Sequence, residues 1–117
     1  MKIRADQMHV FAGEKEQSFF RETAALLRRR HAAALAQCKI ADDRVEGFVR
    51  ESVAAAQQYA LVNEADLRLF CELRLLFGLK LDRDPAVRDV LKRTDIDGET
   101  KMNLLDEMLV FERETPI

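Results

Sequence analysis

The stretch DRVEGFVRESVAAAQQYA, residues 43–60, decides the fold of this chain. Its small and apolar side chains recur at i, i+3, i+4 and i+7, which places them on one face of an α-helix. We predict that this helix begins near Asp43, with Glu46 placed three residues later as in a capping box. The residues on the buried face are Val45, Phe48, Val49, Ser52, Val53, Ala56, Tyr59 and Ala60.

The following stretch, NEADLRLFCELRLLFG (63–78), is apolar around most of a helical circumference. Only Glu64, Arg68 and Glu72 form a polar strip along it, at i, i+4 spacing. Asn63 predicts the N-cap and Gly78 a left-handed stop. A helix with so little polar surface is expected at the centre of a bundle.

Helices are also predicted before and after this pair. Between about residues 4 and 37 the chain has no proline and Gly13 is its only glycine, so it forms either one long helix or two helices broken at Gly13. Asp84 and Pro85 predict the start of a short helix that runs to about Arg93. A polar turn at 94–98 then leads into a closing amphipathic helix.

The composition supports the same fold class. The 117 residues are 48% hydrophobic and 34% charged, and they include only four glycines and two prolines, too few for a turn-rich β architecture. Short loops leave the helices no surface to bury against except one another. We therefore predict an all-α fold, a single-domain irregular bundle of about five helices that spans residues 1–117.

The net charge and the composition limit the kinds of partner that this chain is expected to bind. With 19 basic and 21 acidic residues the formal net charge is -2, so no general affinity for nucleic acid is expected. No stretch has the roughly 18 uninterrupted apolar residues of a membrane span, and the amino terminus lacks the apolar run of a signal peptide. The two cysteines form no closely spaced pair. We predict a cytoplasmic protein without a membrane or nucleic-acid partner.

Catalytic and metal-binding patterns are not found. Along one continuous helix, His9 and His31 would lie roughly 33 Å apart and could not act together in one catalytic site. This exclusion weakens if the helix breaks at Gly13. We interpret His31 as a histidine at the edge of an apolar stripe. The acids near residues 82–84 and 95–98 fit no calcium-loop register, and helix capping by Asp84 and Asp97 explains them better. We expect no catalytic residue, no cofactor and no metal, and hence no enzyme.

The run Arg28-Arg29-Arg30 is the most basic feature of the sequence. Successive helical residues point about 100° apart, so the three arginines fan around the helix instead of forming one strip. A solvated surface is one interpretation, and a patch that faces the carboxylates of a partner protein is the other. Phe20, on the apolar face of the same helix, is a further candidate for partner binding.

Arg74 is the fifth candidate for partner binding, because on a helical wheel it falls inside an apolar arc. A charge in that position needs a partner, since burying it unpaired costs several kcal/mol. Either an acid from another helix reaches it, which we favour, or that face opens to a bound protein.

Three stretches resemble a known group of proteins: YALVNEADL (59–67), LLFG (75–78) and LDRDP (81–85). They are similar to small helical proteins encoded in bacterial type VI secretion gene clusters, beside genes for spike components, effectors and accessory proteins. Ala60 stands where these proteins would have glycine, and Leu81 where they would have phenylalanine.

The resemblance implies a non-enzymatic interaction protein in toxin export. In one role it is an adaptor or co-chaperone that holds an effector protein, or the chaperone of that effector, through reversible and partly polar contacts. In the alternative role it is an immunity protein that tightly binds and neutralises a cognate toxin. Self-association into a homodimer stays open. The acidic balance and the apolar helix at 63–78 disfavour a DNA-binding regulator.

Overall fold

The structure is a computed structural model that describes residues 14–114. Over this range the regular elements are all helical, which confirms the all-α prediction. Two single 3-10 turns accompany six α-helices. The helices are α2 (Glu14–Arg30), α3 (Ala32–Gln37), α4 (Val45–Gln57), α5 (Glu64–Phe77), α6 (Pro85–Leu91) and α7 (Gly98–Glu114).

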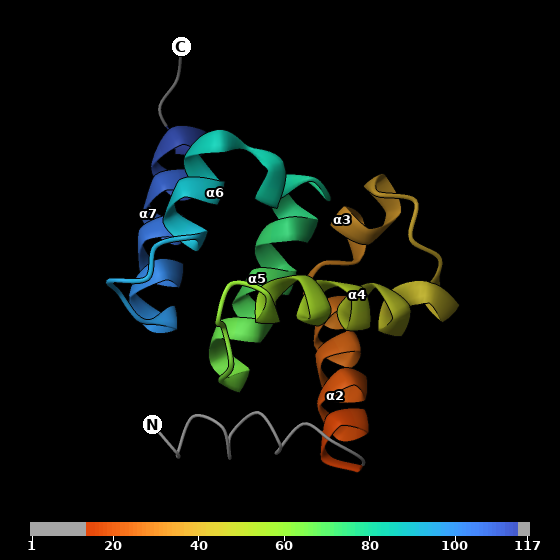
Figure 1. Ribbon diagram of the computed structural model, residues 1–117. Helices are drawn as coiled ribbons and strands as arrows, with labels where there is room; N and C mark the ends of the chain where they lie inside the picture. Colours follow the sequence, from red (N-terminus) through yellow and green to blue (C-terminus); the bar gives the residue numbers. More distant parts are fainter. Residues whose placement is uncertain (1–13, 115–117) are drawn as a thin grey trace.

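Helix α5 lies at the centre of the bundle, as its nearly all-round apolar sequence predicts. It contacts α2, α3, α4 and α7. Figure 1 shows α6 and α7 on one side of α5, with α2 and α3 on the other. The core between these helices contains Phe19, Leu27, Leu67, Phe70 and Leu105, each at most 2% exposed.

The ends of α5 and the starts of the last two helices are set by local capping, as predicted. Asn63 Oδ1 accepts a hydrogen bond from Asp66 N at 2.8 Å, and Gly78 stops the helix with φ of +131°. Asp84 Oδ1 accepts from the backbone N–H groups of residues 86 and 87. Asp97 Oδ1 accepts from the first turn of α7 at 2.9 Å. Helix α6 ends at Leu91, two residues before the predicted end.

The first predicted helix does not run without interruption to Gln37, which adds a sixth helix to the five predicted. His31 has φ of -130° and ψ of 38°, a non-helical conformation that separates α2 from α3. The His31 ring contacts α5, and α3 packs against α5 with Leu35 buried. The break between α2 and α3 therefore lies where this part of the chain contacts α5. The choice left open at Gly13, and His9 with it, lies outside the described residues.

The capping box predicted at the start of α4 is wrong. Residues Asp42–Arg44 form a 3-10 turn, α4 begins at Val45, and no side chain caps it. Glu46 pairs with Arg50 at 2.9 Å, and Asp42, the residue before the predicted cap Asp43, pairs with Arg28. An ion pair with an arginine therefore engages the Glu46 carboxylate in place of a free backbone amide.

Helix α4 also ends earlier than predicted, at Gln57 instead of residue 60. Ala60 has φ of +66°, its N–H donates to Gln57 O, and Leu61 N donates to Ala56 O. These two bonds form a Schellman motif with alanine at the left-handed position. Glycine is the residue that such a position favours.

Candidate functional site

A groove of about 470 Å³ runs along the outer face of α5. On one side it is bordered by the junction of α2 and α3, and on the other by α7. Its floor is apolar and its rim is charged. The floor residues are Leu69, Leu73, Leu76 and Phe77, and the rim residues are Arg30, His31, Glu72 and Asp106.

The floor of the groove follows from the sequence of α5. Leu69, Leu73 and Leu76 recur at i, i+4 and i+7, which stacks them along one stripe of the helix. Leu73 is 2% exposed and forms the base of the stripe, whereas Leu76 is 39% exposed and open to solvent. The stripe is therefore an apolar surface that the bundle covers only in part.

The rim on the α2–α3 side is a charged cluster. His31 Nε2 lies 3.1 Å from Glu72 Oε2, and Arg30 Nη1 lies 3.7 Å from the same oxygen. The side chains of His31 and Glu72 are 20% and 17% exposed. These contacts join the interruption after α2 to α5, so the edge of the groove is held by side chains from two parts of the chain.

The three arginines at the end of α2 point to different places, as the fan geometry predicts. Arg28 Nε lies 3.1 Å from Asp42 Oδ1, and its Nη2 donates to the Asp42 carbonyl. Arg29 is exposed. Arg30 reaches the rim of the groove. Of the three, Arg30 alone lines the apolar groove.

Phe20 and Arg74 lie away from this groove and are buried, at 5% and 8% exposed. Arg50 covers the Phe20 ring, with its guanidinium carbon 5.0 Å from the ring centroid. Neither Phe20 nor Arg74 offers accessible surface to a partner of the folded chain.

An acid from another helix, Glu51, reaches Arg74 as we favoured, but the closest partners of Arg74 are two uncharged oxygens. Its guanidinium donates to Ser52 Oγ at 2.8 Å and to Leu79 O at 2.8 Å, and lies 3.7 Å from Glu51 Oε1. Two of these groups belong to α4, so the arginine ties α5 and the turn after it to α4. Arg74 is therefore a structural residue in the bundle.

Sequence reasoning did not identify the groove. It assigned the whole apolar circumference of α5 to the core, although α5 keeps Leu76 at 39% exposure. The α5 sequence carries no signal that separates its covered from its open apolar residues, because a helix that is apolar on most sides is expected to be buried.

Among residues 14–114 no cluster of histidine, cysteine or acidic side chains is arranged to hold a metal ion. None of the helices described is long and apolar enough to cross a membrane. Comparison with protein-family models, with curated proteins and with solved structures finds no match to this chain.

Proposed function

We propose that this chain is a non-enzymatic protein–protein interaction module, an adaptor or co-chaperone that holds a type VI secretion effector or its chaperone in the cytoplasm. The observation that supports it is the groove on α5, an apolar floor inside a charged rim. Protein interfaces have this anatomy, with an apolar centre and a polar, solvent-accessible edge. The sequence resemblance supplies the secretion setting.

The occupant that fits the groove is an amphipathic helix of the client protein. The floor is a stripe along α5, and a second helix can pack its apolar ridge against such a stripe. Arg30 lies on one edge and Asp106 on the other. We expect the client helix to place an acidic residue beside Arg30 and a basic residue beside Asp106, because opposite charges at a rim fix the register of binding.

The direct test is capture of the effector that is encoded in the same gene cluster as this chain, by co-expression and affinity purification. Leu76→Lys places a charge in the groove and is expected to weaken binding at least about tenfold. Leu79→Lys is the matched control, because Leu76 and Leu79 are both 39% exposed and Leu79 does not line this groove. Equal binding by both variants, or no binding by the wild type, contradicts the proposal.

A second experiment separates the adaptor from the immunity protein. The effector is expressed in its toxic form with and without this chain. Under the adaptor proposal the chain is needed for accumulation or secretion of the effector and does not neutralise it. Rescue of the cells by this chain alone would overturn the adaptor role and support immunity.

A further inference from the structure

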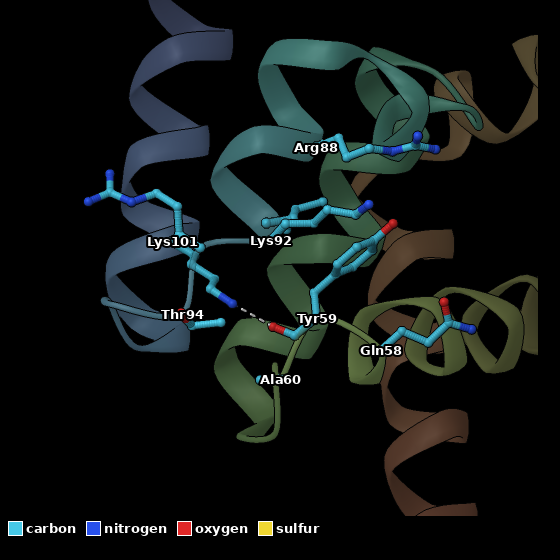
Figure 2. Close-up of a pocket in the computed structure, with 9 residues that line it drawn as sticks. Gln58, Tyr59, Ala60, Arg88, Lys92, Thr94 and Lys101 are labelled. Atoms are coloured by element: carbon cyan, nitrogen blue, oxygen red, sulfur yellow. Dashed lines mark hydrogen bonds between the residues drawn. The ribbon is translucent and has the colours of Figure 1, made fainter.

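A second hollow lies between the C-terminal end of α4, helix α6 and the first turns of α7 (Figure 2). Its volume is about 500 Å³, and it shares no lining residue with the groove on α5. Four cations line it, Arg88, Lys92, Arg93 and Lys101, and no carboxylate among the described residues does so. The formal charge of -2 for the whole chain conceals this local excess of positive charge.

Lys101 is buried, at 4% exposed. Its Nζ donates to Tyr59 O at 2.8 Å, and this bond is drawn in Figure 2. An ammonium group has three donors, and within the described part of the chain no carboxylate lies within 4.0 Å of Lys101 Nζ. Burial lowers the pKa of this lysine, as expected for a charge removed from water, while the charge of Asp95 acts in the opposite direction.

Arg88 and Lys92 occupy i and i+4 positions at the end of α6 and are exposed. Figure 2 shows both side chains extending from α6 toward the side of the hollow where the Tyr59 ring lies. Their location gives them access both to solvent and to an ion bound in the hollow. Arg93 differs, because its Nη2 lies 2.6 Å from Asp95 Oδ2 and its charge is compensated.

The helix dipoles offset part of the positive charge of the hollow but not all of it. The C-terminal ends of α4 and α6 both border the hollow, and each end carries about half a negative charge. The two ends together offset about one positive charge. Arg88, Lys92 and Lys101 supply three, which leaves an excess of roughly two positive charges that the backbone does not balance.

We propose that this hollow binds the phosphate group of a small phosphate monoester, with Lys101 at its base and Arg88 and Lys92 at its mouth. A phosphate monoester carries a charge of about -1.5 to -2 at neutral pH, which matches the unbalanced charge of the hollow. Guanidinium groups bind phosphate oxygens through paired hydrogen bonds. The volume also leaves room for an organic group on the phosphate, because small-molecule sites occupy about 300–1,000 Å³.

The test uses isotope-labelled full-length protein titrated with inorganic phosphate and with ribose 5-phosphate at constant ionic strength, followed by amide chemical shifts. We expect saturable binding of ribose 5-phosphate in the micromolar to low millimolar range, tighter than that of inorganic phosphate, with shifts confined to residues near 58–60 and 88–101. The double variant Arg88→Gln/Lys92→Gln is expected to weaken binding at least about tenfold. Both positions are exposed, so the variant keeps the fold.

Arg21→Gln is the control, because Arg21 is an exposed arginine on α2 that does not line the hollow. It is expected to bind like the wild type. Shifts spread over the surface, equal losses in control and double variant, or no saturation by either ligand would overturn the proposal. Tighter binding of inorganic phosphate than of the monoester would overturn the assignment of a monoester, and tighter binding of a single-stranded oligonucleotide would overturn that of a small ligand. None of these results bears on the groove, which uses other residues.

Discussion

Two buried cations in this bundle differ in how many hydrogen-bond acceptors surround them. Arg74 and Lys101 are 8% and 4% exposed, so both side chains are withdrawn from water. Arg74 donates to a hydroxyl and a carbonyl and lies over the Phe48 ring, with its guanidinium carbon 5.4 Å from the ring centroid. Lys101 donates to one carbonyl, that of Tyr59, and borders a hollow that is open to solvent.

The difference separates a structural charge from one available to a ligand. The fold itself supplies the acceptors around Arg74, so its removal leaves a carbonyl and a hydroxyl without their donor. The fold supplies Lys101 with one acceptor, at the end of α4, and the ammonium keeps donors for a bound anion. Burial of a cation is therefore informative only together with the number of acceptors that face it.

The largest expected effect is that of Arg74→Met. The side-chain volume is roughly kept, but Leu79 O and Ser52 Oγ lose a charged donor. We expect the free energy of unfolding to fall by about 3 kcal/mol, measured by urea denaturation. Arg50→Met is the control, since Arg50 is exposed and pairs with Glu46 on the same helix, and it should lose less than about 1 kcal/mol. Similar losses in the two variants would mean that Arg74 is not held as described.

The second expected effect concerns Cys71, a fully buried residue near Arg74. Burial raises the pKa of its thiol from 9.0 to about 12, although Ser52 and Arg74 act in the opposite direction. Between these values the unfolded chain loses the proton while the folded chain keeps it, so stability falls as pH rises from 9 toward 12. Relative to Cys71→Ala, we expect the wild type to lose about 2 kcal/mol between pH 8 and pH 10.5. Parallel pH profiles for the two proteins would contradict this expectation.

The third variant, Lys101→Met, tests the contribution of the second buried cation to stability. It loses one hydrogen bond from a charged donor, about 1.5–3 kcal/mol, but also removes the desolvation cost of a buried ammonium. We expect a change in stability at pH 7 of less than about 1 kcal/mol, well below that of Arg74→Met. A loss as large as that of Arg74→Met would show that Lys101 is as fully engaged as the arginine.

The pH dependence of the Lys101→Met difference gives an independent check. The pKa of Lys101 is lowered from 10.5 by burial, so on raising the pH the folded chain releases this proton before the unfolded chain does. Stability of the wild type relative to the variant therefore rises with pH in the window just below 10.5. A flat difference across that window would mean that the ammonium is solvated in the folded protein.

The features predicted correctly from the sequence are those that depend on neighbouring residues. The caps at Asn63, Asp84 and Asp97 each bind an amide two or three residues away. The central position of α5 follows from its own composition. Arg74 could be recognised because its place on the helical wheel contradicts its charge.

The interruption after α2, the buried lysine and the groove were missed because they depend on contacts between distant parts of the chain. His31 meets Glu72 across 41 positions, and Lys101 meets the Tyr59 carbonyl across 42. No local periodicity encodes such distances, so neither the interruption after α2 nor the buried lysine was predicted. The groove was missed for a related reason, since its opening depends on where α3 and α7 stop covering α5.

The smallest expected effect lies beside the Lys101 hollow, at Ala60. An L-residue with φ of +66° is strained, because its Cβ approaches the backbone, and glycine removes that contact. We expect Ala60→Gly to raise the free energy of unfolding by about 0.5–1 kcal/mol, the strain relieved less the added freedom of the unfolded chain. Lys39, with φ of 59°, should respond in the same direction.

Ala54→Gly provides the matched control for this stabilisation. Ala54 is exposed in the interior of α4, where glycine is expected to cost about 1 kcal/mol. Opposite signs at positions 54 and 60, measured by urea denaturation, would establish that backbone conformation and not residue type decides the outcome. A loss at both positions would mean that the turn after α4 relaxes out of the left-handed region. The carbonyl of the preceding residue, Tyr59, would then no longer be held in place for Lys101.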